Sequence, residues 1–190
     1  MNRYGQEVYL VRHGETEWSL SGQHTGSTDI PLTPNGEEVA RQLGRKLADH
    51  NFAAVISSPM SRALDTARLA GFEHDVRLSD DLKEWDYGEY EGLTTPQIRE
   101  RRPDWWLWRD GCPGGESPAQ VGARADRLIA EVRAVDGDVL LFGHGHILRV
   151  ITARWLGYPA GDGMHFSLGT ATLSMLGWER EAASIWRWNA

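Results

Sequence analysis

Cysteine, long apolar runs and positive charge are all scarce in this sequence. The 190 residues hold one cysteine, Cys112, so no disulfide can form within the chain and a reducing cytoplasm is the expected location. No stretch is apolar and long enough to span a membrane, and residues 1–5 lack the apolar core of a signal peptide. Lys and Arg number 20 against 27 Asp and Glu, which gives a formal net charge of −7. That balance argues against a nucleic-acid partner, and the lack of a long apolar stretch argues against a membrane partner.

What remains is typical of one ordinary globular domain. Hydrophobic residues make up 41% and charged residues 25%, and 190 residues are enough for a single sizeable core. We find no internal repeat and no linker, so residues 1–190 are predicted to form one domain. The nine tryptophans require no cofactor, because most of them fit a core.

An arginine-histidine pair follows the first apolar run. Residues 8–11 (VYLV) end abruptly in Arg12, His13 and Gly14. This pattern predicts a buried parallel strand that runs into a polar loop, the place where open α/β sheets bind ligands. A fixed cation would then lie beside an imidazole able to act as nucleophile or base. The alternative is that the pair only caps a sheet edge.

A matching unit lies far downstream. Residues 139–142 (VLLF) form a second apolar run, which ends in Gly143, His144, Gly145 and His146, and a helical pattern begins at Ile147. Because the carboxyl ends of parallel strands share one edge of a sheet, two imidazoles are predicted to meet in one crevice. For each histidine alone, the alternative is a satisfied structural side chain.

Two further segments complete the set. The strand predicted over residues 53–57 is followed by a turn and a helix with Arg62 in its first turn, near backbone amides that favour anions. Residues 82–92 place carboxylates among aromatic residues, and Glu84 is the candidate general acid because desolvation raises the pKa of a carboxyl group. Asp86, Glu89 and Glu91 are interpreted as ordinary exposed charges.

Helix and strand patterns alternate along most of the chain. Helices are predicted to begin at residues 34 and 118, a short edge strand at residues 75–78, and a terminal hairpin over residues 170–178 and 184–188. Residues 94–116 interrupt the alternation with arginine, tryptophan, proline and glycine, and we interpret them as a cap over the pocket. The predicted fold is a three-layer α/β/α sandwich around a mostly parallel sheet, with an antiparallel edge strand and this small cap insertion.

Taken together, these motifs resemble the histidine phosphatase superfamily, in its phosphoglycerate-mutase-like branch. They occur in the order typical of the family and span nearly the whole chain. Residues 105–112 further resemble members of the acid-phosphatase and sedoheptulose-bisphosphatase type. The matching motifs are R-H-G-E-T at Arg12–Thr16, H-T-G at His24–Gly26, S-P-x-S-R-A at Ser58–Ala63, E-W-D-Y-G-x-Y-E-G at Glu84–Gly92 and G-H-G-H at Gly143–His146.

The resemblance implies a two-step phosphoryl transfer. His13 would be the nucleophile that forms phosphohistidine, His144 would help hold the transferring group, and Glu84 would protonate the leaving oxygen and then activate water. Arg12 and Arg62 can offer forked donors to phosphoryl oxygens, which suits an anionic transition state. No metal and no cofactor are expected in this scheme, because arginines and imidazoles supply the positive charge.

Outer contacts with the substrate are predicted less directly. By resemblance, Thr25 and Gly26 match a loop that touches the phosphate or substrate, Tyr87 matches an aromatic residue near the acid, and His146 lies beside the second histidine. The further candidates are Ser19, where many relatives carry an asparagine, and Arg109 in the cap, for which a salt bridge with Asp110 is the alternative. Arg99, Arg101 and Arg102 are interpreted as a solvated face.

Three functions are weighed. A metal-independent phosphomonoesterase for small phosphorylated metabolites, such as a sugar phosphate or bisphosphate, is favoured, because the cap is compact and the sequence ends two residues after Trp188. A phosphoglycerate mutase would have a larger insertion and a mobile tail over the site. A non-catalytic phosphate-binding module would lack a core residue, and all are present. An aromatic phosphoester fits the cap equally well as a substrate.

The terminal strand is a candidate edge for pairing with a second copy of the chain in a homodimer.

Overall fold

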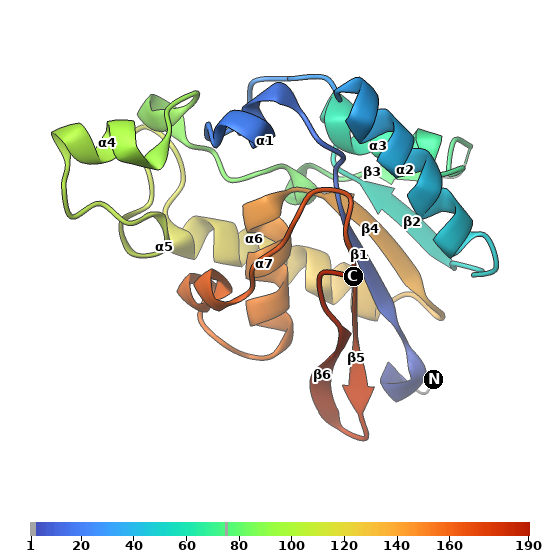
Figure 1. Cartoon of the computed structure of the whole chain (residues 1–190). Coiled ribbons are helices and arrows are strands. Elements are labelled where there is room, and N and C mark those ends of the chain that lie inside the picture. The colour runs from blue at the N-terminus through green and yellow to red at the C-terminus, as the bar shows by residue number, and fades with distance from the viewer. Residues whose placement is uncertain (1–2, 75) are drawn as a thin grey trace.

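Six strands form one mixed sheet in the order β3-β2-β4-β1-β5-β6 (Figure 1). The computed structural model describes residues 3–74 and 76–190. Strands β1 to β4 run parallel, and β5 and β6 run antiparallel at one edge. The predicted sheet, mostly parallel with an antiparallel edge, is therefore confirmed. The strands are β1 (Val8–Arg12), β2 (Ala54–Ser57), β3 (Val76–Leu78), β4 (Val139–Gly143), β5 (Leu173–Glu179) and β6 (Ala182–Arg187).

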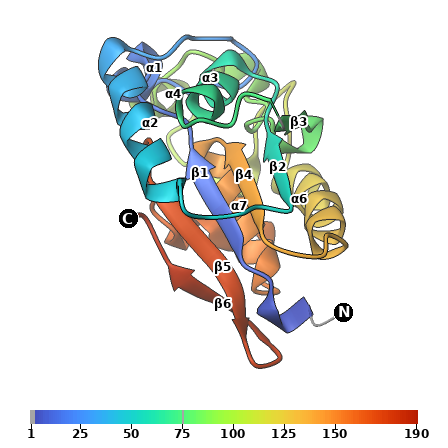
Figure 2. The same cartoon turned by 90° about the vertical axis from the view of Figure 1, so that its right-hand side faces the viewer.

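Helices cover both faces of the sheet and complete the three layers (Figure 2). On one face, α2 (Pro34–Leu47) and α3 (Ser61–Leu69) bury leucine and alanine side chains against a core that includes Phe142. On the other face, α6 (Pro118–Arg133) and α7 (Gly145–Trp155) pack on a larger core that includes Leu141. Alternate residues of the buried strand β4 thus point into opposite cores. Among the described residues, no helix is both long and apolar enough to cross a bilayer.

The long helices begin where the sequence predicts. The hydroxyl of Thr33 accepts a hydrogen bond from Gly36 N, and the hydroxyl of Ser117 accepts one from Gln120 N. In both helices a proline occupies the first helical position, where its missing N–H costs nothing. These caps fix the starts of α2 and α6.

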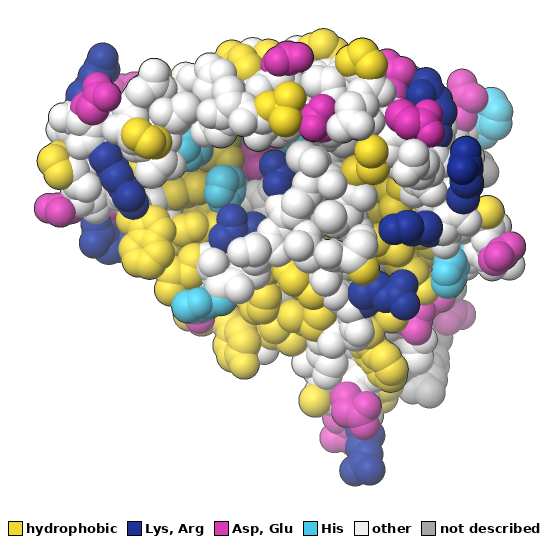
Figure 3. All heavy atoms as spheres, in the orientation of Figure 1, with side chains coloured by type: hydrophobic (Ala, Val, Ile, Leu, Met, Phe, Trp, Pro, Cys, Tyr) yellow, Lys and Arg dark blue, Asp and Glu magenta, His cyan; other side chains and the backbone are white. Residues whose placement is uncertain are grey.

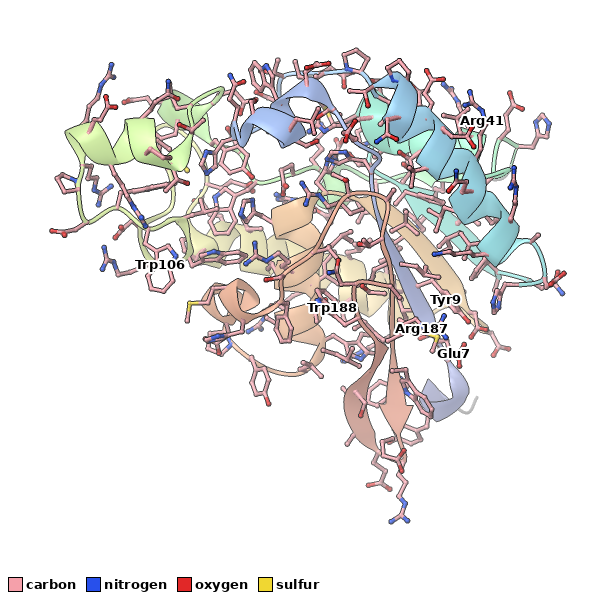
Figure 4. All side chains as sticks on the ribbon, viewed as in Figure 1. Glu7, Tyr9, Arg41, Trp106, Arg187 and Trp188 are labelled. Carbon is pink, nitrogen blue, oxygen red and sulfur yellow. The ribbon has the colours of Figure 1, made fainter. Side chains whose placement is uncertain are left out.

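Short elements fill the connections. Two of them lie in the cap: α4 (Thr95–Arg101), which stands apart from the long helices in Figure 1, and α5 (Leu107–Asp110). Of the cap tryptophans, Trp105 and Trp108 are buried, whereas Trp106 is 44% exposed and lies at the edge of the molecule in Figure 4. The cap therefore has its own apolar anchors. The remaining short elements are α1 (Glu17–Ser21) and the 3-10 helices η1 (Arg3–Gly5), η2 (Asp80–Leu82), η3 (Gly88–Tyr90) and η4 (Ala160–His165).

Several boundaries differ from the prediction. Helix α7 begins at Gly145, not at residue 147, and His144 is its extended N-terminal cap residue with φ −125° and ψ 173°. Strand β5 begins at Leu173, not at residue 170, because Ala171 adopts a left-handed φ of 52° that interrupts extended backbone. The predicted edge strand is present as β3, and residue 75 lies outside the described residues.

Candidate active site

The carboxyl ends of three neighbouring strands meet at one edge of the sheet. The His13 amide, just after β1, donates to the carbonyl of Gly143 on β4 at 2.9 Å. The Ser58 amide, just after β2, donates to the carbonyl of Phe142 at 2.9 Å. As a result the rings of His13 and His144 lie with their centroids 5.2 Å apart. The structure thus brings together the two histidine segments that are far apart in the sequence.

The hydrogen bonds of His13 fix its tautomer. Its Nδ1 lies 2.7 Å from the carbonyl oxygen of Gly14, which can only accept, so Nδ1 carries the proton. Nε2 then holds the lone pair, and within the described residues it has no hydrogen-bond partner. Burial lowers the pKa of His13 well below its ordinary value, and the cations Arg12 and Arg62 lower it further. His13 is therefore a neutral imidazole with an available nitrogen at neutral pH.

The Arg12 side chain is held in place beside the start of α7. Its Nη1 donates to the carbonyl of Leu168 at 2.5 Å, while its buried Nε has no hydrogen-bond partner among the described residues. A Cβ at Gly145 would lie 3.3 Å from the Arg12 guanidinium, so glycine allows the start of α7 to approach the cation closely. A buried donor without a partner is costly, and an anion bound here would satisfy it.

Arg62 and His144 form a fully buried pair behind His13. The Arg62 Nε donates to His144 Nδ1 at 3.1 Å, which places the histidine proton on Nε2, and Nε2 donates to the Ser58 hydroxyl at 2.8 Å. Burial lowers the pKa of His144 well below its ordinary value, and the charge of Arg62 adds to the effect. His144 is therefore neutral, with both ring nitrogens engaged by the protein.

The rest of the Arg62 guanidinium holds a loop. Its Nη2 donates to the carbonyls of Thr25 and Gly26 at 3.1 and 3.0 Å, and its Nη1 donates to the carbonyl of Thr28 at 3.0 Å. Asp29 lies 3.8 Å from Nη1 and is half exposed. Arg62 thus links α3, the loop of residues 25–29 and His144, and its forked donors face protein carbonyls.

Glu84 is buried at the N-terminus of α7. One carboxylate oxygen accepts hydrogen bonds from the amides of Trp85 and Ile147, and the other accepts from the amide of His146, all at 2.9 Å. Free amides and the helix dipole at a helix N-terminus favour such a carboxylate. These contacts join residues 84–85 to the start of α7, which lies just after His144.

Aromatic rings surround the second histidine of the segment. The Tyr87 hydroxyl and His146 Nδ1 are 2.6 Å apart, and the rings of Trp85 and Trp108 contact His146 edge-on. Burial lowers the pKa of His146 well below its ordinary value, with Arg149 as a further cause, and burial raises the pKa of Tyr87. Both groups are therefore neutral at neutral pH.

A cavity of about 250 Å³ opens in front of these groups. Figure 3 shows a hollow beside the segment that carries α4, where histidine and Lys or Arg side chains gather. Most of the predicted site residues reach this cavity. Those that line it are Arg12, His13, Ser19, Thr25, Glu84, Tyr87 and His146.

Four predicted residues do not line the cavity. Arg62 and His144 lie behind it, as described above. Gly26 lies under the loop, where an added Cβ would come within 2.7 Å of the Trp85 carbonyl oxygen. Arg109 is exposed on the cap and pairs with Asp110 through Nε and Nη2, both at 2.9 Å. For Arg109 the structure therefore shows the salt bridge, which was the alternative to a substrate contact.

The side chains of Ser19 and Glu91 have local structural partners. The Ser19 hydroxyl accepts from the amide of Thr16 and donates to its carbonyl, which caps α1. Glu91 was expected to be an ordinary exposed charge, and this is wrong. It is only partly exposed, and its carboxylate accepts from the amides of Gly26 and Thr28 because the loop folds back onto it.

Further cavity residues escaped the sequence analysis. His24 lines the cavity and donates from Nδ1 to the carbonyl of Leu93 at 2.7 Å, and Trp18 lines it from α1. Arg149 also lines it, one turn after Gly145 on α7. The sequence signal for Arg149 was its spacing of four residues from Gly145, because residues four apart on a helix share one face.

The arrangement suits phosphoryl chemistry. A neutral imidazole nitrogen, an arginine with an unpaired donor and a carboxylate line one cavity, while a second arginine and a second histidine lie behind them. Arginines stabilise anions through forked donors, and phosphoryl transfer depends mainly on positioning and charge. Within residues 3–74 and 76–190 no group of three His, Cys, Asp or Glu side chains is placed to hold a metal ion.

Comparisons with known proteins agree with this chemistry. The acid phosphatase of Mycobacterium tuberculosis (strain ATCC 25618 / H37Rv) is 47% identical over 176 residues, which cover 90% of this chain and 86% of the relative. The sedoheptulose 1,7-bisphosphatase of Saccharomyces cerevisiae is 38% identical over 180 residues, which cover 78% and 66%. The solved structure of the product of the Mycobacterium tuberculosis open reading frame Rv3214 has a TM-score of 0.92 at 43% identity and covers 97% of each chain.

A family match covers nearly the whole chain. Residues 8–190 match the histidine phosphatase superfamily (branch 1). The resemblance inferred from the sequence motifs is thereby confirmed, as is the assignment to an enzyme of this kind. The chain belongs to the histidine phosphatase superfamily.

Proposed function

We propose that this enzyme is a metal-independent phosphomonoesterase that acts through a phosphohistidine on His13. The observation that carries the proposal is the state of this side chain. Gly14 fixes the proton on Nδ1, burial keeps the ring neutral, and the unshared pair on Nε2 belongs to a residue that lines the cavity. A neutral, oriented nitrogen is what nucleophilic attack on phosphorus requires.

In the first step Nε2 attacks phosphorus and the bond to the leaving oxygen breaks. Arg12 stabilises the phosphoryl oxygens, beginning with its unpaired Nε donor. Arg62 adds positive charge at the same end, and neutral His144 adds an N–H group. To contact the phosphoryl group directly, each of these side chains must give up a hydrogen bond to the protein. The simplest to give up is the one from His144 Nε2 to the Ser58 hydroxyl.

Glu84 serves both steps in this proposal. It lines the cavity beside His13, and its carboxyl group gives a proton to the leaving oxygen. In the second step it takes a proton from water, whose oxygen attacks the phosphohistidine, and inorganic phosphate is released. The three amides around the carboxylate hold it in one position for both transfers.

The proposed substrates are small phosphorylated metabolites, with a sugar phosphate or bisphosphate favoured. Two relatives support this class, since one is named an acid phosphatase and the other a sedoheptulose 1,7-bisphosphatase. Within the cavity the aromatic rings of Trp18 and Tyr87 offer an apolar wall for a carbon skeleton. A cytoplasmic location and a homodimer through the edge strand β6 remain predictions.

The test is hydrolysis of p-nitrophenyl phosphate and of a panel of sugar phosphates, each with and without a chelator. We expect turnover that the chelator does not change, with inorganic phosphate equal to the substrate consumed. No turnover of any phosphoester would contradict the proposal and favour a phosphate-binding module instead.

A second assay separates a phosphatase from a phosphoglycerate mutase. Incubation with 3-phosphoglycerate is followed by phosphorus NMR. A phosphatase releases inorganic phosphate, and added 2,3-bisphosphoglycerate gives no large stimulation. Rapid formation of 2-phosphoglycerate with little free phosphate would show that the enzyme is a mutase.

A further inference from the structure

Helix α7 presents a second cation to the cavity, one turn beyond the phosphate end. Gly145, its first residue, lies against the Arg12 guanidinium, and Arg149 lines the same cavity. Four residues along a helix correspond to a rise of about 6 Å. The cavity is therefore lined by two cations, Arg12 beside the start of α7 and Arg149 from one turn further along this helix.

The Arg149 guanidinium is held in place by three contacts. Its Nε and Nη2 donate to the carbonyls of Gly163 and Met164, both at 3.1 Å. Its flat face lies over the ring of Trp108, with 4.4 Å between the guanidinium carbon and the ring centroid. A Cβ at Gly163 would come within 2.6 Å of that ring, so the three elements pack tightly. The orientation of the cation is therefore fixed before any ligand binds.

These contacts leave part of the Arg149 fork unused. Within the described residues its Nη1 donates to no acceptor, and no carboxylate lies within ion-pair distance of its guanidinium. Burial lowers the pKa of Arg149, so the charge is partly removed from water. The charge of Glu84 acts on Arg149 from beyond ion-pair distance and raises its pKa, so this oriented, partly desolvated cation has no direct counter-ion. Such a cation favours an anionic ligand.

The side chains that line the cavity carry a net positive charge. Arg12 and Arg149 line it with two positive charges, and Glu84 supplies one carboxylate, while His13 and His146 are neutral. This local surplus contrasts with the net charge of −7 for the whole chain. A substrate with a single phosphate at Arg12 leaves Arg149 without an anionic partner.

We propose that Arg149 binds a second anionic group of the substrate, at the end of the carbon skeleton opposite the phosphate that is cleaved. The preferred substrates are then phosphomonoesters that carry a further phosphate or carboxylate. This inference rests on the proposed phosphatase function. The alternative is that Arg149 is only a clamp, which joins α7 to η4 and to the cap through Trp108.

The first test needs only the wild-type enzyme and matched substrates. Fructose 1,6-bisphosphate is compared with fructose 1-phosphate and fructose 6-phosphate, and 3-phosphoglycerate is compared with glycerol 3-phosphate. We expect kcat/KM to favour the doubly anionic member of at least one set by about 10- to 100-fold, the range of a charge-assisted hydrogen bond. The preferred set tells whether the second group is a phosphate or a carboxylate. Equal kcat/KM within every set would overturn the proposal, whether or not any variant folds.

The second test assigns the preference to Arg149. Arg149→Gln should lose most of the preference through a rise in KM for the doubly anionic substrate, and Arg149→Lys should keep part of it. Arg154→Gln is the matched control, because Arg154 lies on the same helix but pairs with exposed Asp126 at 2.8 Å. It should keep the full preference. A purely structural role predicts instead that Arg149→Gln lowers thermal stability and lowers kcat/KM equally for every substrate.

The phosphatase function and the role of Arg149 are contradicted by different results. If the wild type does not hydrolyse p-nitrophenyl phosphate or any other phosphoester, the phosphatase function itself is wrong. If it hydrolyses monoesters but discriminates no second anion, only the role of Arg149 is wrong. A preference that survives in Arg149→Gln would also contradict that role.

Discussion

The two ends of the cavity are built in different ways. At the inner end (Arg12, His13 and Glu84, with Arg62 and His144 behind), the arginine-histidine pair and His144 lie at strand ends, and Glu84 bonds to the backbone of α7. Arg62 comes from the first turn of α3. At the outer end (His24, His146 and Arg149), the side chains are fixed by loops and by aromatic rings of the cap.

The difference shows how each part of the site is specified. The inner end depends on the sheet register, since His13 and Ser58 bond to consecutive carbonyls of β4. The proposed nucleophile is therefore positioned by the central strands of the sheet. The outer end depends on contacts between distant segments, such as Arg149 with Trp108. Loops and caps are where specificity can change without loss of the scaffold.

The largest expected effect concerns the proton donor at the inner end. Glu84→Gln cannot give a proton, so the phosphorylation step should slow by about 100- to 10,000-fold for alkyl phosphates. A nitrophenolate leaving group scarcely needs protonation and should lose much less. Single-turnover kinetics with both substrates measure the difference. Equal losses would indicate that Glu84 only positions α7.

The second prediction compares the contributions of two arginines to stability: Arg62, buried at the inner end, and Arg109, exposed on the cap. Arg62→Lys removes a fork that holds the carbonyls of Thr25, Gly26 and Thr28. The free energy of unfolding should fall by about 2–4 kcal/mol, because buried acceptors lose their donors. Denaturant unfolding gives the value.

The matched control for that change is Arg109→Lys. Arg109 is exposed and pairs with its neighbour Asp110, and such surface pairs contribute little. The variant should unfold like the wild type and keep its activity. Similar losses in the two variants would contradict the distinction between the buried inner end and the exposed cap.

The loop beneath the inner end gives a smaller effect. In Gly26→Ala the new Cβ would meet the Trp85 carbonyl oxygen at 2.7 Å and the Glu91 carboxylate at 2.8 Å. Relief of these contacts should cost about 1–3 kcal/mol of stability and displace Thr25. Gly5→Ala is the control, since nothing lies within 4 Å of its Cβ position. Thermal unfolding of both variants checks the prediction, and equal melting temperatures would refute it.

The smallest effect is a change in the pH dependence of stability at the outer end. Burial lowers the pKa of His24, so below about pH 6.5 the unfolded chain takes up a proton that the folded state does not. The free energy of unfolding therefore falls as the pH falls from 6.5. In His24→Asn, whose amide can replace the Nδ1 donor to Leu93, this fall should be less steep by at most about 1.4 kcal/mol per pH unit. Urea unfolding between pH 5 and 7.5 measures the slope, and an unchanged slope would contradict the shift.

Much of the inner end could be predicted because its signals are local. An apolar run that ends in Arg12 and His13, and another that ends in His144, indicate strand ends without knowledge of the rest of the fold. The start of α7 was placed two residues late, because His144 is itself the cap residue and is not a typical helix cap.

The outer end could not be predicted in the same way. Arg109 was a candidate because it stands between Trp108 and an acid in the cap, yet that acid is its partner. The spacing of Arg149 from Gly145 indicates only a shared helix face, and its fixed orientation depends on Trp108, which the cap places against it. Glu91 was misjudged for the same reason, since its partners are amides of a loop more than sixty positions earlier, as the separations of 63 and 65 residues show.

The most direct test of the proposed mechanism is to trap the phosphorylated enzyme. The wild type is mixed with a phosphorus-labelled substrate and quenched within milliseconds, and the labelled residue is identified by mass spectrometry. We expect acid-labile, base-stable phosphate on His13 and no label in His13→Ala, which should remain folded. Label on a serine or a carboxylate, or full activity without His13, would contradict the assignment of this imidazole as the nucleophile.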